Sequence, residues 1–274
     1  MSGFDWASGS GWITAGGKRL EAKAIGPAPG AAPTIVMLHE GLGSVGLWRD
    51  FPEALAKATG CGVFLWSRAG YGASEPGDLP RPTDYQTREA MDVLPDVLGE
   101  IGFQEGVLLG HSDGATIAAE YAGGVVDHRV RGLILMAPHF FVEEIGVAAI
   151  RSAKTAFKEG DLRARLAKHH SDPDNAFRGW NDAWLHPDFA DWNVADCIDY
   201  FRIPTLAIQG RDDAYGTLAQ IEEIDARSYA PVDLEVIADC GHAPHLEAPD
   251  ATLAAMAEFI ARLRRIESTH VSVA

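Results

Sequence analysis

A serine stands between two glycines in the segment Gly110-His111-Ser112-Asp113-Gly114. The apolar run 107–109 before it predicts a buried strand, and the residues 115–121 after it have the apolar spacing of a helix. A strand that turns this tightly into a helix leaves no room for a Cβ at either flanking position, which explains both glycines. Such a turn exposes the serine hydroxyl and directs the next backbone N–H, that of Asp113, toward the atom that the hydroxyl attacks. We therefore predict that Ser112 is a nucleophile; the alternative is an ordinary turn between a strand and a helix.

Two further residues stand where a serine nucleophile needs help, since serine reacts poorly without an adjacent base. Asp213 follows the apolar run 204–208, and His242 follows the run 233–237. The carboxyl ends of parallel strands share one edge of a sheet, so these side chains and Ser112 are expected to project from the same edge. A histidine there can take and return the proton, and a carboxylate can fix its tautomer. Asp212 competes with Asp213 for the second role, and a histidine such as His242 can also be an ordinary core residue.

The elements that position these residues alternate along the chain between strands and helices. Continuous apolar strands between helical segments predict a mostly parallel sheet with helices on both faces, an α/β fold. The predicted strands are a hairpin over 12–25 and the runs 34–38, 62–66, 107–109, 130–136, 204–208 and 233–237, and the predicted helices are 47–58, 87–101, 115–121, 217–227 and 251–265. The alternation of strands and helices stops over 141–200. We interpret this segment as a helical lid inserted into a core formed by 1–140 and 201–274, because a structureless loop of that length is improbable.

Five blocks of sequence, in this order, make the chain resemble the α/β-hydrolase superfamily over nearly its whole length. They are His39-Glu40-Gly41, Gly70-Tyr71-Gly72-Ala73-Ser74, the segment Gly110 to Gly114, Gly210-Arg211-Asp212-Asp213 and Gly241-His242-Ala243-Pro244-His245-Leu246-Glu247. The resemblance implies the α/β-hydrolase fold with a helical lid and a triad of Ser112, Asp213 and His242. It also implies that no cofactor or metal is needed. The Gly-x-x-Asp spacing of the superfamily selects Asp213 over Asp212.

An oxyanion hole, the pair of backbone N–H groups that holds the negative oxygen formed during the reaction, is also expected. Asp113 supplies one N–H, and the turn after the strand 34–38 supplies the other, with Gly41 as the first candidate and Leu42 as the second. The chain departs from the superfamily pattern at Glu40, where glycine is common, and the carboxylate of Asp113 is a second acid beside the nucleophile. These acids either pair locally, for example with Arg68 or His111, or face the substrate, in which case they disfavour anionic substrates.

The predicted reaction is the cleavage of a carboxylic ester through an acyl-enzyme, as in carboxylesterases. One alternative is a hydrolase of C–C bonds in diketone-type substrates with the same triad, and another is a binding protein that has lost turnover. Haloalkane dehalogenases and epoxide hydrolases are disfavoured, because they need aspartate in place of Ser112. Leu42, Trp180 and Trp184 are candidate substrate contacts, although lid tryptophans, Trp192 included, can equally form the core of the lid.

The composition limits the partners of the protein. The chain has 274 residues, a net charge of −16 and 47% hydrophobic residues. This charge argues against nucleic acid and anionic membrane surfaces, which select clustered Lys and Arg, and leaves a small-molecule substrate as the expected partner. The three cysteines fit reduced thiols in the cytoplasm, and neither a signal peptide nor a transmembrane stretch is predicted. The oligomeric state is left open, a homodimer included.

Overall fold

The computed structural model describes residues 3–271, with side chains up to 265. Within this range, eight strands form one sheet in the order β1-β2-β4-β3-β5-β6-β7-β8. The strands are β1 (Ser10–Ala15), β2 (Lys18–Ile25), β3 (Thr34–Leu38), β4 (Gly62–Trp66), β5 (Gly106–His111), β6 (Val130–Met136), β7 (Thr205–Gly210) and β8 (Val232–Ile237). β2 pairs antiparallel with β1 and β4, and every other neighbouring pair is parallel. The predicted α/β fold is confirmed.

The burial of the strands follows their place in the sheet. Every residue of β3, β4, β5 and β7 is buried, as expected for strands covered on both faces. Along β2, buried residues alternate with more exposed ones, because this strand belongs to the antiparallel hairpin at one side of the sheet. The hairpin therefore lies at one side of the sheet, and the parallel strands form the centre of the sheet.

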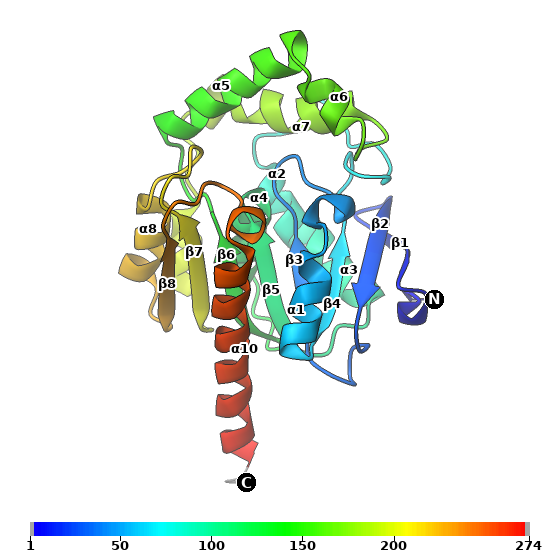
Figure 1. The fold of residues 1–274 in the computed structure, drawn as a ribbon, viewed down its shortest axis with the longest axis vertical. Coiled ribbons are helices and arrows are strands. Elements are labelled where there is room, and N and C mark those ends of the chain that lie inside the picture. Colours follow the sequence, from blue (N-terminus) through cyan, green and yellow to red (C-terminus); the bar gives the residue numbers. More distant parts are fainter. Residues whose placement is uncertain (1–2, 272–274) are drawn as a thin grey trace.

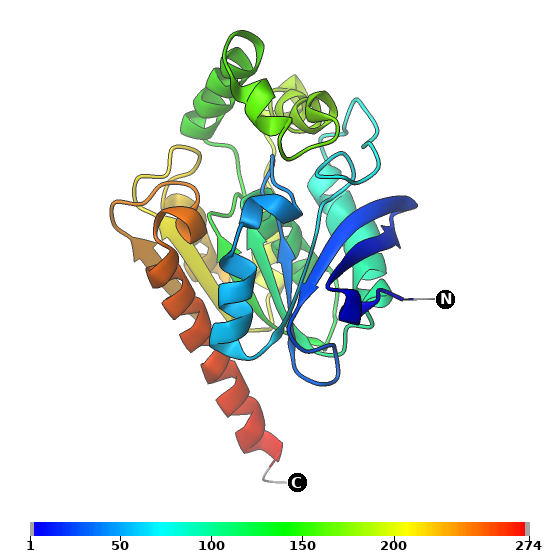
Figure 2. The same cartoon turned by 45° about the vertical axis from the view of Figure 1, so that its right-hand side comes forward.

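Helices cover both faces of the sheet (Figures 1 and 2). On one face, α1 (Phe51–Thr59) and α10 (Pro249–Val271) lie side by side and pack on apolar residues of β3 to β7. On the other face lie α3 (Leu94–Glu100), α4 (Asp113–Gly124) and α8 (Ala219–Arg227). Two separate apolar cores result, one on each side of the sheet.

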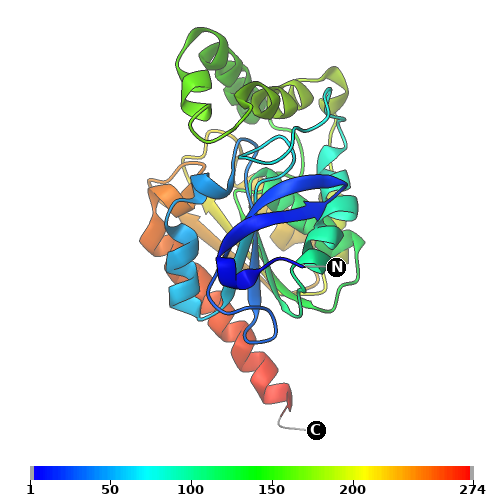
Figure 3. The ribbon, with the colours of Figure 1, turned by 90° about the vertical axis from the view of Figure 1, so that its right-hand side faces the viewer.

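The segment between β6 and β7 forms helices of its own, as predicted. They are α5 (Glu144–Glu159), α6 (Leu162–Leu166) and α7 (Pro173–Trp184). These helices lie beyond one edge of the sheet (Figures 1 and 3) and share a third apolar cluster that includes Ile150, Trp180 and Trp184. The short helix Ala195–Tyr200 instead packs against α4 with the core of the sheet. The division into a core and a lid over 141–200 stays a prediction, and we call residues 141–200 the insertion.

The predicted helix over 87–101 is interrupted. It consists of α2 (Tyr85–Arg88), a π-helical turn (Glu89–Val93) and α3. Pro95 closely follows the π-helical turn, and because it has no backbone N–H it cannot donate a hydrogen bond back into that turn. The short helix α9 (Pro244–Glu247) precedes α10. No helix within residues 3–271 is both long and apolar enough to cross a membrane.

Candidate active site

Ser112 occupies the turn between β5 and α4 in a strained backbone conformation. Its φ of 52° and ψ of −118° lie outside the regions that residues with a side chain normally adopt. The turn is as tight as the sequence indicates. A Cβ on Gly110 would lie 2.2 Å from the carbonyl oxygen of Gly114, and a Cβ on Gly114 would lie 2.1 Å from that of Leu38. Both glycines are thus sterically required for the serine to stand at the tip of the turn.

The structure brings the three predicted catalytic side chains together from three loops. His242, in the loop after β8, places Nε2 3.0 Å from the Oγ of Ser112. Its Nδ1 lies 2.9 Å and 2.8 Å from the two carboxylate oxygens of Asp213, which follows β7. A neutral imidazole in this arrangement donates Nδ1–H to the carboxylate and leaves Nε2 free to accept a proton from the serine hydroxyl.

The carboxylate of Asp213 is held firmly and stays ionised. Gln209 Nε2 donates to one oxygen at 2.7 Å, and the backbone N–H of Tyr215 donates to the other at 2.8 Å. Burial acts to raise the pKa of Asp213, but the hydrogen bond and charge of His242 outweigh it and the pKa is lowered. The side chain of the competing Asp212 is exposed, and no hydrogen bond joins it to His242 in the described part of the chain. The geometry therefore favours Asp213 over Asp212.

Two backbone segments, the start of α4 and the turn after β3, place N–H groups beside the cavity next to Ser112. Asp113 is the first residue of α4, a position at which helical N–H groups have no partner within the helix. Gly41 and Leu42 follow β3, and within residues 3–271 the N–H of neither donates to another part of the protein. All three residues line the same cavity as Ser112.

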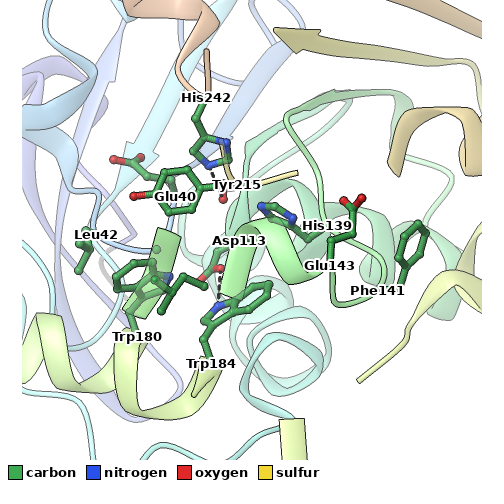
Figure 4. Close-up of a pocket in the computed structure, with 14 residues that line it drawn as sticks. Glu40, Leu42, Asp113, His139, Phe141, Glu143, Trp180, Trp184, Tyr215 and His242 are labelled. Carbon is green, nitrogen blue, oxygen red and sulfur yellow. Dashed lines mark hydrogen bonds between the residues drawn. The ribbon is translucent and has the colours of Figure 1, made fainter. Parts of the chain in front are cut away.

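The cavity above Ser112 is lined by the sheet edge on one side and by the insertion on the other (Figure 4). Leu42, Trp180 and Trp184, the predicted substrate contacts, all line it. Trp192 does not; its ring stacks on Phe189 at a centroid distance of 5.0 Å, within the cluster of the insertion. Sequence reasoning missed six further lining residues: His139, Phe141, Glu143, Gly146, Ile150 and Tyr215. The position of His139 to Glu143 just after β6, at the reactive edge, was the available signal for three of them.

Both unusual acids line the cavity and both pair locally. The buried Asp113 carboxylate lies 3.5 Å from the Arg68 guanidinium and accepts hydrogen bonds from Tyr85 Oη at 2.6 Å and Gln86 Nε2 at 3.2 Å. Glu40 lies 3.5 Å from Nδ1 of His111. Burial acts to raise the pKa of Glu40. The hydrogen bond and the electrostatic interaction with His111 oppose this effect, and the pKa falls far below its usual range. Local pairing, one of the two sequence-based alternatives, is thus observed for both acids, and the lowered pKa keeps Glu40 charged beside the cavity.

The remaining histidines near the site support its walls. His111 Nε2 lies 2.7 Å from the carbonyl oxygen of His242. This contact joins the end of β5 to the loop after β8. His245 is buried against Trp48, with ring centroids 4.8 Å apart. Burial lowers the pKa of His139 to about 3, so this ring faces the cavity uncharged. Among the described residues, no group of three or more His, Cys, Asp or Glu side chains is arranged to hold a metal ion.

Comparison with known proteins agrees with this architecture. A family described as the alpha/beta hydrolase family matches residues 35–255. The proline iminopeptidase of Lactobacillus delbrueckii subsp. bulgaricus is 23% identical over 261 residues, which cover 81% of this chain and 88% of that protein. The structure of VinJ matches with a TM-score of 0.73 at 21% identity, covering 93% of this chain and 99% of VinJ. The enol-lactonase from Burkholderia xenovorans LB400 matches with a TM-score of 0.69 at 18% identity, covering 92% and 100%.

Proposed function

This chain belongs to the alpha/beta hydrolase family, and on that premise we propose that it is a serine hydrolase that cleaves a carboxylic ester through an acyl-enzyme. The observation that carries the proposal is the double contact of one imidazole. His242 reaches the Ser112 hydroxyl with Nε2 at 3.0 Å and the Asp213 carboxylate with Nδ1 at 2.8 Å. A base that is oriented by a carboxylate and touches a strained serine is the arrangement that activates a hydroxyl for attack on a carbonyl.

The proposed reaction proceeds in two halves. Ser112 Oγ attacks the ester carbonyl while His242 Nε2 takes the hydroxyl proton, and the Asp213 carboxylate stabilises the imidazolium. The N–H groups of Asp113 and Gly41, with Leu42 as the alternative to Gly41, hold the negative oxygen of the tetrahedral intermediate. His242 then gives its proton to the departing alcohol. A water then gives a proton to His242 Nε2 and attacks the acyl carbonyl. The second tetrahedral intermediate expels Ser112 Oγ, which takes the proton back from His242, and the acid is released.

The lining of the cavity supports an uncharged or cationic substrate. Aromatic rings form much of the wall, the carboxylates of Glu40 and Glu143 lie at its border, and no Lys or Arg is among its lining residues in the described part of the chain. An anionic acyl or alcohol group would meet these carboxylates without a compensating cation. The same observation favours a second candidate, release of an N-terminal residue with a free amine, the type of reaction named for the relative from Lactobacillus delbrueckii.

Two measurements test the proposal. A fluorophosphonate probe should label wild type and should not label Ser112→Ala, while Ser152→Ala, which changes an exposed serine on α5, should be labelled as wild type. Hydrolysis of p-nitrophenyl esters should then be compared with hydrolysis of prolyl and other aminoacyl p-nitroanilides. Turnover of the esters without turnover of the anilides supports the esterase, and turnover of the anilides supports the second candidate. Labelling that survives in Ser112→Ala contradicts the assignment of the nucleophile.

A further inference from the structure

Helix α7 of the insertion contacts both backbone segments to which the proposed function assigns the oxyanion hole. Trp180 and Trp184 are four residues apart and therefore lie on one face of α7. The ring of Trp180 lies against Gly41, where a Cβ would come within 2.3 Å of the indole. Trp184 Nε1 donates to Tyr85 Oη at 3.0 Å. The same Nε1 lies 3.3 Å from a carboxylate oxygen of Asp113 (Figure 4). Helix α7 therefore contacts both segments, through Trp180 at Gly41 and through Trp184 at Asp113.

A third contact reaches the same loop from outside the cavity. His170, between α6 and α7, is buried and does not line the cavity. Its Nδ1 accepts a hydrogen bond from the backbone N–H of Gly72 at 3.0 Å, so in the neutral ring Nε2 carries the proton and donates to the carbonyl oxygen of Leu42 at 3.0 Å. Burial lowers the pKa of His170, which keeps the ring in this neutral form. The loop that carries Leu42 is therefore joined to the insertion by a side chain that lies outside the cavity.

Within the core, Arg68 joins the same two segments. Its guanidinium donates to the carbonyl oxygens of His39 and Glu40, each at 3.1 Å, and lies 3.5 Å from the carboxylate of Asp113. The loop after β3 and the start of α4 are thus coupled through one buried cation. This network leaves the backbone at Gly41 and at Asp113 little freedom to move independently of α7.

We propose that the insertion is a structural part of the oxyanion hole, with His170, Trp184 and Tyr85 as positioning residues that hold the Leu42 and Asp113 segments in place. This inference rests on the proposed function. Oxyanion donors accelerate a reaction because they are already aimed at the position of the developing charge, and a displacement of about 1 Å can cost on the order of 100-fold in rate. Loss of one of these positioning residues should therefore slow the hydrolysis of every ester by a similar factor. A lid that only selects substrates would instead change the ratio between esters.

The test uses His170, because it acts outside the cavity. His170→Phe removes both hydrogen bonds. It should lower kcat on the order of tenfold for p-nitrophenyl acetate, butyrate and octanoate alike, with KM within about twofold of wild type. It should also weaken inhibition by phenylboronic acid, which forms a tetrahedral adduct, by a factor similar to the loss in kcat/KM. His170→Gln, which can again donate to the Leu42 carbonyl, should recover part of the loss. The matched control is His169→Phe, at the adjacent exposed position, which should behave as wild type.

The outcomes separate the inference from the proposed function. If wild type is not labelled at Ser112 and cleaves no ester, the proposed function fails. If wild type is active and His170→Phe keeps its kcat, or loses activity only for some chain lengths, the inference is overturned. Should His170→Phe not fold, Tyr85→Phe makes the same test, because it removes the hydroxyl between Trp184 and Asp113. Its matched control is Tyr121→Phe, which deletes a comparable hydroxyl bonded to Asp127 at 2.8 Å, away from the site.

Discussion

Replacing Asp213 by asparagine tests most directly whether this carboxylate orients His242, the proposed base. Each carboxylate oxygen lies within 2.9 Å of His242 Nδ1, and each also accepts a second hydrogen bond. An asparagine NH2 at one position faces the N–H of Tyr215, and at the other it faces the amide of Gln209. The variant therefore loses the charge that stabilises the imidazolium and disturbs the tautomer that leaves Nε2 free. The expected loss in kcat is on the order of 10⁴, equivalent to about 5 kcal/mol of transition-state stabilisation.

The assay is the hydrolysis of p-nitrophenyl acetate at saturating substrate, together with the rate of fluorophosphonate labelling. Asp212→Asn is the matched control: it makes the same change one residue earlier, at an exposed side chain, and should stay within about twofold of wild type. A loss below tenfold in Asp213→Asn, or an equal loss in Asp212→Asn, would show that the hydrogen bonds to His242 do not define the catalytic acid.

Three further substitutions test other parts of the structure. Gly41→Ala should lower kcat by roughly 100-fold or more, because its Cβ would lie 2.3 Å from Trp180 and displace an oxyanion donor; activity near wild type would exclude Gly41 from that role. Ile150→Ala enlarges the cavity from α5, so kcat/KM for octanoate relative to acetate should rise, and an unchanged ratio would limit Ile150 to packing. Burial raises the pKa of Glu120 from 4.5 to about 7, so the folded state binds the extra proton and stability falls as pH rises through that window. Glu120→Gln should abolish this fall, at most about 3 kcal/mol by urea unfolding at about pH 5 and about pH 8, and a wild-type pH slope in the variant would contradict it.

The sequence predicted the sheet and the meeting of Ser112, Asp213 and His242 because both depend on local patterns. Buried parallel strands are continuous apolar runs, and the loops after them share one edge regardless of the details of packing. Only the choice between neighbouring residues, such as Asp212 and Asp213, required the motif spacing of a superfamily. These features are therefore readable without knowing which helix packs on which strand.

The walls of the cavity could not be predicted in the same way. An amphipathic helix shows which face is buried, but not what the face packs against. The partners of His170 lie 98 and 128 residues away in the chain, and no local spacing encodes such contacts. Local pairing of Asp113 was one of the two alternatives predicted from the sequence, but the contribution of Trp184 depends on where α7 is placed.

The contacts of α7 also set a rule for engineering the substrate range. A chimera that exchanged the segment between β6 and β7 for that of another hydrolase would remove Trp184 and His170. The Asp113 carboxylate would then lose a donor in a buried position, and the carbonyl oxygen of Leu42 would lose its partner. A functional graft must therefore carry equivalent donors or change the core residues that meet them. The insertion and the loops beneath it form a single exchangeable unit, although they are far apart in the sequence.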